Sequence, residues 1–105
     1  MSMTVIVTRN VAARYRGFLA SVMLEVAPGV YTSPRMNAGV RERVWTVLSD
    51  WFGANITFGA QSETAASIIM TWRDDTASGG QHVETLGLPA TSLVEVDGLW
   101  LVKRP

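Results

Sequence analysis

The chain of 105 residues contains no cysteine, which excludes disulfide bonds and thiolate metal sites. Its single histidine, His82, is too few for a zinc finger or a histidine-rich catalytic site. No run of about 18 apolar residues is present, so no membrane-spanning segment and no membrane partner are predicted. The opening residues lack the basic, apolar and small-residue regions of a secretory signal, so we expect a cytoplasmic protein.

The chain also has no net charge, because its nine basic residues balance its nine acidic residues. The hydrophobic fraction of 48% is typical of a packed soluble domain rather than a disordered chain. A chain of this length removes roughly 65% of its unfolded surface from water in one core. We therefore expect a single domain over residues 1–105.

The charges are unevenly distributed along the chain. Residues 1–45 hold six arginines against two glutamates, a net charge of +4. Residues 46–105 hold three basic residues against seven acidic ones, a net charge of −4. This asymmetry indicates a polyanion site in the first half, with a scatter of solvated arginines as the alternative.

Strand and helix patterns alternate in the first half. Met3 to Thr8 is rich in β-branched residues and predicts a strand, and Asn10 is a suitable N-cap for the following helix. We expect Pro28 and Gly29 to end that helix before a strand over Val30 to Thr32. Its apolar positions at helical spacing are Val11, Tyr15, Phe18, Leu19, Val22, Met23 and Val26. Outside this face lie Arg14, Arg16, Ser21 and Glu25.

A second helix is predicted to begin at Ser33-Pro34 or at Asn37 and to end at Gly53. Its apolar stripe consists of Val40, Val44, Val47, Leu48 and Trp51. Residues 53–66 have no clear period and are interpreted as a loop. Strands over Ser67 to Arg73 and Gln81 to Leu86 follow, joined by a turn over residues 74–80. Asp97-Gly98 predicts a tight turn in a C-terminal hairpin over residues 92–103.

Two of these strands are apolar on both faces, since Val5 and Val7 alternate with Ile6, and Met70 with Ile69. Two helices cover only one face of a small sheet. A second copy of the chain would cover the other face, because isologous dimers are the commonest oligomers. A fold-back of the terminal hairpin is the alternative.

These segments together resemble a known family. L-E-V-A-P-G-V-Y, R-E-R-V-W and V-D-G-L-W-L-V stand in the order and spacing of the small CRISPR-associated protein that partners the CRISPR integrase in spacer acquisition. The similarity is to its type I-E branch, the second universal CRISPR-associated family. It covers residues 1–52 and about 66–103, and residues 53–65 look like an insertion.

The resemblance implies an α+β, ferredoxin-like β-α-β-α-β-β sandwich with a C-terminal hairpin, forming a homodimer through its sheets. It implies a bridge between two integrase dimers that holds double-stranded DNA, both protospacer and CRISPR repeat. Arg14 and Arg16 match arginines that touch the DNA backbone, and they lie about 200° apart around a helix. Arg41, at a basic family position, and Arg43 are further candidates. Ala90 and Thr91 replace a basic pair, whose contact would be missing or moved to Lys103 and Arg104.

Some members of the wider family cut RNA or DNA with a metal held by an acidic residue at the end of the first strand. Arg9 stands there, and a guanidinium does not ligate magnesium. We therefore expect a non-catalytic protein without a cofactor, and the alternative is a nuclease that would need Mg²⁺. A ligand-sensing module is a third reading, but Gly79, Gly80 and Gly87 form no recognisable ligand loop. The predicted docking element for the integrase is the terminal hairpin, through Leu93, Val94, Val96, Leu99, Trp100, Leu101 and Val102.

Overall fold

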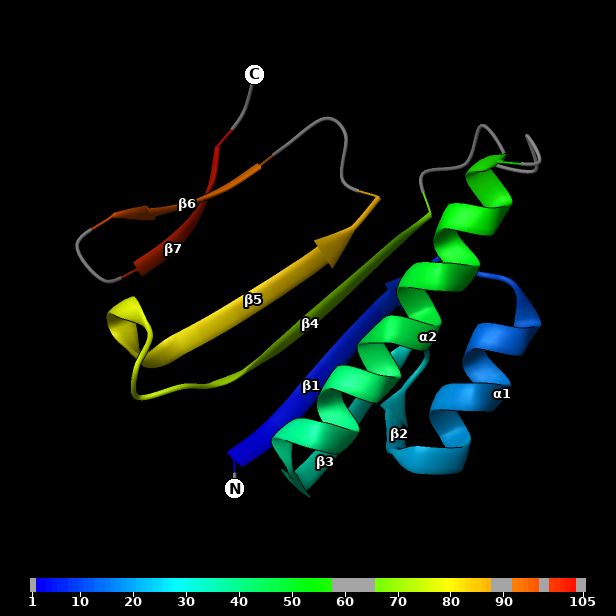
Figure 1. Cartoon of the computed structure of the whole chain (residues 1–105), viewed down its shortest axis with the longest axis horizontal. Helices are drawn as coiled ribbons and strands as arrows, with labels where there is room; N and C mark the ends of the chain where they lie inside the picture. The colour runs from blue at the N-terminus through cyan, green and yellow to red at the C-terminus, as the bar shows by residue number, and fades with distance from the viewer. Residues whose placement is uncertain (1, 58–65, 88–91, 97–98, 104–105) are drawn as a thin grey trace.

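The computed structural model describes residues 2–57, 66–87, 92–96 and 99–103, with side chains described for residues 2–53 and 66–87. Two α-helices lie among the strands of the first half, and the second half is built of strands (Figure 1). The elements in chain order are β1 (Ser2–Arg9), α1 (Ala13–Val22), β2 (Leu24–Ala27), β3 (Val30–Met36), α2 (Ala38–Thr57), β4 (Ser67–Arg73), a short 3₁₀ turn η1 (Ser78–Gly80), β5 (Gln81–Leu86), β6 (Ser92–Val96) and β7 (Leu99–Lys103).

Five strands form one antiparallel sheet in the order β2-β3-β1-β4-β5. The first four strands and the two helices make a β-α-β-β-α-β unit, in which β1 lies between β3 and β4. The fold is therefore α+β and ferredoxin-like, as expected, with β5 added beside β4. Strand β2, which the sequence patterns did not indicate, completes the unit.

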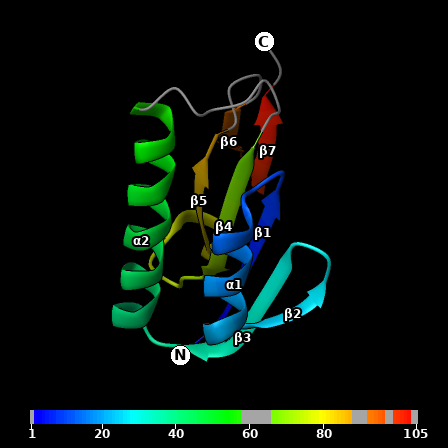
Figure 2. The same cartoon turned by 90° about the vertical axis from the view of Figure 1, so that its right-hand side faces the viewer.

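Both helices cover the same face of this sheet (Figure 2). Alternate residues of β1 point toward them, so that Ile6 is fully buried between its cross-strand partners Tyr31 and Met70. The core consists of Ile6, Tyr15, Leu19, Met23, Tyr31, Met36, Val44, Leu48, Ile68 and Met70.

The first helix is shorter than its apolar periodicity predicts. It ends at Val22, and Leu24–Ala27 is a strand that pairs with β3, so the expected helical positions of Glu25 and Val26 are wrong. Pairing with β3 supplies hydrogen bonds between segments and overrides the local helical spacing. The first residue of this helix also differs from the prediction, because the N-cap is Ala12, which makes no side-chain cap hydrogen bond. Asn10 instead adopts a left-handed conformation with φ 58°, which asparagine tolerates better than most residues.

Pro28 and Gly29 form the turn between β2 and β3 and do not end a helix. The Thr8 N–H donates to the Gly29 carbonyl oxygen at 2.7 Å, and the Thr8 hydroxyl donates to the same oxygen at 3.2 Å. The Gly29 N–H donates to Glu25 Oε2 at 3.0 Å. A Cβ at Gly29 would lie 2.7 Å from the Thr8 carbonyl oxygen, and φ is +78°, so glycine is required here.

The second helix begins where Asn37 was expected to cap it. The Val40 N–H donates to Asn37 Oδ1 at 2.8 Å, whereas Ser33 and Pro34 lie within β3. Gly53 does not end the helix, which continues to Thr57. One glycine in a helix costs only about 1 kcal/mol, and nothing lies within 4 Å of a Cβ placed at Gly53. Residues 53–57 of the proposed insertion are therefore helical, and residues 58–65 lie outside the described part.

The predicted strands of the second half are confirmed. Strand β4 has the expected bounds Ser67–Arg73, and β5 the expected bounds Gln81–Leu86. Strands β6 and β7 pair antiparallel in a separate two-stranded sheet, as the predicted hairpin requires. The turn residues Asp97 and Gly98 lie outside the described residues.

Apolar side chains also line the face of the sheet that the helices leave free. Val5 and Val7 of β1 alternate with the buried Ile6, and Ile69 of β4 is the cross-strand neighbour of Val7. Leu24 shares this face, because Leu24 and Val5 both pair with Thr32. Val7 is 39% and Leu24 67% exposed. The prediction that apolar residues line both faces is confirmed: on the second face Val5 and Ile69 are half-buried, while Val7 and Leu24 are exposed.

Tyr31 is fully buried, yet its hydroxyl has no hydrogen-bond partner of ordinary geometry. Burial raises the pKa of Tyr31, and the nearby Glu25 carboxylate raises this pKa further. The protonated hydroxyl is therefore favoured in the folded state. Below about pH 10, the ordinary pKa of tyrosine, the hydroxyl is protonated in both the folded and the unfolded state, so the raised pKa does not change the free energy of unfolding. Above that pH the hydroxyl ionises in the unfolded chain first, and the free energy of unfolding falls.

We expect Tyr31→Phe to remove part of this alkaline loss of stability. At pH 7 the variant should unfold with an unchanged free energy or one up to about 1 kcal/mol higher, because it removes an unpaired buried hydroxyl without removing the ring. Urea unfolding at pH 7 and pH 10.5, with the wild type as reference, measures both effects. A loss of more than about 2 kcal/mol at pH 7 would show that the hydroxyl is bonded after all.

Candidate nucleic-acid interface

The candidate site begins with Arg14 and Arg16 on α1, whose side chains are both exposed. The core residues Tyr15 and Leu19 fix which face of α1 packs on the sheet. Positions 14 and 16 flank that face, about 100° to either side of Tyr15. The helix thus presents one guanidinium on each flank, as the spacing predicted.

The two guanidinium groups have different surroundings. The Arg14 guanidinium carbon lies 4.7 Å from the centre of the Trp51 ring on α2 and 5.6 Å from the centre of the Tyr15 ring. Arg16 forms no ring contact and no ion pair with a described residue, and its charge acts to lower the pKa of Tyr31, against the larger effects that raise it. One guanidinium therefore rests against aromatic rings, whereas the other makes no such contact with a described residue.

Arg41 occupies a second arginine–tryptophan contact, which the sequence did not indicate. Its guanidinium carbon lies 4.0 Å from the centre of the Trp72 ring, and its Nη1 donates to the Met36 carbonyl oxygen at 3.4 Å. Trp72 also stacks on His82, with ring centres 4.4 Å apart. His82 Nε2 in turn lies 2.8 Å from Glu84 Oε2. Arg41 is thus half-buried and engaged at the β4–β5 side of α2, whereas Arg14 and Arg16 are exposed.

Arg43, two positions further along α2, is exposed and forms no ion pair with a described carboxylate. Arg9 is likewise exposed, at the end of β1 where it pairs with Ser67 of β4. Among the described residues, the exposed Arg9, Arg16 and Arg43 thus form no ion pair with a carboxylate. This arrangement favours binding of an anion over neutralisation within the chain.

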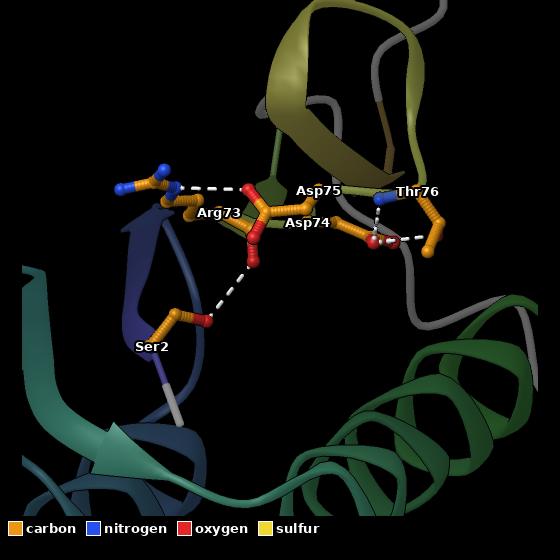
Figure 3. Close-up of polar contacts among 5 residues, drawn as sticks. All are labelled: Ser2, Arg73, Asp74, Asp75 and Thr76. Atoms are coloured by element: carbon orange, nitrogen blue, oxygen red, sulfur yellow. Dashed lines mark hydrogen bonds and ion pairs between the residues drawn. The ribbon is translucent and has the colours of Figure 1, made fainter.

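The acidic residues of the β4–β5 turn are occupied by the turn itself (Figure 3). Asp74 Oδ1 accepts hydrogen bonds from the Thr76 N–H at 3.0 Å and from the Thr76 hydroxyl at 2.6 Å, and these bonds lower the pKa of Asp74. Asp75 pairs with Arg73 at 3.1 Å, and the Ser2 hydroxyl donates to the Arg73 carbonyl oxygen. Asp74 and Asp75 therefore stabilise the turn into which the sequence placed them.

No group of three or more His, Asp and Glu in the described ranges is arranged to hold a metal ion. In the same ranges, no helix is long and apolar enough to cross a membrane.

The predicted integrase-docking residues lie on β6 and β7, whose pairing is described while their side chains are not. The register places Leu93 opposite Val102, and Val94 opposite Leu101. Ala90, Thr91 and Arg104 lie outside the described residues, and so does the side chain of Lys103. The candidate contacts at these positions stay predictions.

The fold and the arginine-bearing helix define a small ferredoxin-like α+β protein with a basic helical surface. A family model described as "CRISPR-associated protein (Cas_Cas2CT1978)" matches residues 3–101. The chain therefore belongs to this Cas2-like family of CRISPR-associated proteins and takes part in a CRISPR system.

Proposed function

We propose that this protein is a dimeric, non-catalytic bridge in CRISPR adaptation, which holds duplex DNA by its backbone and joins two integrase dimers. Family membership supports a role in a CRISPR system. The observation that carries the finer proposal is the placement of Arg14 and Arg16, exposed on a helix, in a chain whose net charge is zero. Arginine stays charged and offers several donors, so it suits phosphate contacts that position a duplex without reading its bases.

The proposed dimer joins the helix-free faces of two sheets. This face carries the exposed Met3, Val7 and Leu24, and further apolar residues from β3, β4 and β5 extend it across the strands. Burying apolar surface of this kind stabilises association by roughly 25 cal/mol per Å² before the costs of association. A two-fold axis through the interface doubles each arginine, so four guanidinium groups from Arg14 and Arg16 act on one duplex.

In this proposal the integrase performs strand transfer, and the hairpin of β6 and β7 is its docking element. The outer edge of a short antiparallel pair offers unpaired backbone groups, with which a strand of the partner can form hydrogen bonds. The alternative of a metal-dependent nuclease gains no support from Arg9, because the family nucleases place an acidic residue there. We therefore propose that the chain needs no metal for its own role.

We expect the wild type to be a dimer at micromolar concentration and Val7→Asp to dissociate it. Val7 lies near the middle of the helix-free face, so an aspartate there would be desolvated in the dimer without a partner, whereas the monomer leaves it in water. Dimer affinity should fall by at least about 100-fold, which corresponds to about 2.7 kcal/mol.

Sedimentation equilibrium over a concentration series measures this change. Thr46→Asp is the matched control, because it adds the same charge at an exposed position of α2. The control should dimerise like the wild type. A wild type that stays monomeric at tens of micromolar, or a Val7→Asp variant as dimeric as the control, would contradict the proposed interface.

A further inference from the structure

Trp51 forms a fixed aromatic surface between the two helices. Its ring contacts Tyr15 edge-on, with centres 5.3 Å apart and an interplanar angle of 86°, and contacts Phe18 at 5.6 Å and 68°. Tyr15 is only 1% exposed and belongs to the core. The indole is therefore anchored to the core on one side, and its ring face is the surface on which the Arg14 guanidinium rests, 4.7 Å from the ring centre.

A guanidinium that lies flat on an indole keeps its N–H groups in its own plane, so they point sideways past the ring and not into its face. These N–H groups are the ones that bind the two oxygens of a phosphate in bidentate fashion. The contact also restricts a long side chain that would otherwise sample many rotamers. Arg14 therefore loses less freedom on binding a phosphate than an unrestrained arginine would.

From this geometry we infer that Trp51 is a positioning residue for phosphate binding: it holds the Arg14 guanidinium ready for the DNA backbone. The inference rests on the proposed function, because it assigns to a duplex backbone the anion that Arg14 receives. The inference gives Arg14 a different role from Arg16, because Arg16 contacts no described aromatic ring. Trp51 touches no DNA in this account and acts through Arg14.

The test measures binding of a fluorescein-labelled 30-base-pair duplex to the full chain by anisotropy across a salt series. Trp51→Leu keeps an apolar contact for Phe18 and removes the ring face. We expect about tenfold weaker binding, since two copies of Arg14 each lose their restraint. The slope of log affinity against log salt should stay at the wild-type value, because no charge is removed. Arg14→Gln should lower this slope.

A double-mutant cycle decides whether the effect passes through Arg14. In the Arg14→Gln background, Trp51→Leu should change affinity by less than about twofold. Trp51→Phe, which keeps a ring, should restore most of the binding and guards against a Trp51→Leu chain that folds poorly. Circular dichroism and urea unfolding check the fold of each variant.

Equal losses from Trp51→Leu with and without Arg14 would overturn the inference, because Trp51 would then act on helix packing alone. Wild-type affinity in a folded Trp51→Leu variant would overturn it too. Failure of the proposed function gives a different result: the wild type, alone and with its integrase, would not bind the duplex at low salt. A tenfold loss that disappears in the Arg14→Gln background supports the inference.

Discussion

Reversing both charges in Arg14→Glu with Arg16→Glu is expected to weaken binding of a short DNA duplex by at least about 100-fold. In the proposed dimer four guanidinium groups become four carboxylates, so phosphate contacts are lost and repulsion is added. Both side chains are exposed on α1, and glutamate forms helices about as well as arginine, so the fold should be retained. The loss should shrink as salt is raised.

Anisotropy titrations at 50 and 200 mM salt measure this loss, for the isolated chain and for its complex with the integrase. Arg14→Lys with Arg16→Lys is the matched control, because it keeps both charges and removes only the planar donor fork. The control should lose far less affinity than the glutamate variant. Equal binding by the glutamate variant and the wild type would remove α1 from the site.

Leu48→Ala is expected to destabilise the fold by about 2–5 kcal/mol, a large part of the roughly 5–15 kcal/mol typical of a domain. Leu48 is fully buried where α2 packs on the sheet and belongs to the core with Ile6 and Ile68. Truncation removes its transfer free energy and leaves a cavity that central strands cannot readily close.

Val40→Ala on the same helix is the control, because Val40 is 43% exposed although the apolar stripe included it. We expect its effect to stay below about 1 kcal/mol. Urea unfolding at one fixed protein concentration compares the two variants, since dimer formation would add a concentration-dependent term. Equal losses would contradict this difference in burial and would mean that Val40 packs as tightly as Leu48.

The strands of the sheet centre could be predicted because their patterns are local. Ile6 alternates with Val5 and Val7, and Ser67–Arg73 is bounded by a turn segment, so burial and strand period agree. Strand β2 could not be found in this way. Its apolar residues continue the spacing of α1, and only hydrogen bonding to β3, which comes later in the chain, makes Leu24–Ala27 extended.

Two helix boundaries were predicted wrongly because the residue at each boundary can play more than one structural role. The sequence predicts Asn10 as an N-cap, but asparagine also tolerates left-handed backbone, which is its role here. The sequence predicts Gly53 as the end of the second helix, but an isolated glycine costs a helix too little to end it. In both cases, the tertiary structure selects between two roles that the sequence allows.

The exposure of Arg14 and Arg16 followed from the helical period, since they flank the apolar face of α1. The contact of Arg14 with Trp51 could not be predicted, because it depends on how α1 and α2 pack beside each other. The same holds for Arg41 and Trp72, which meet only across α2 and β4. Sequence patterns thus indicate which arginines reach solvent, and packing decides which of them are held in place.

The close fit of Gly29 against Thr8 has a consequence for chain length. Thr8 stands at the end of β1, just before the chain leaves the sheet for α1, and two of its donors grip one oxygen of the β2–β3 turn. An extra residue at Pro28 would therefore disturb the end of β1, which leads into the arginine-bearing helix, as well as the turn itself. We therefore expect an inserted residue to be tolerated less well between Leu24 and Val30 than in an exposed loop, because this turn is fixed to β1 through Thr8.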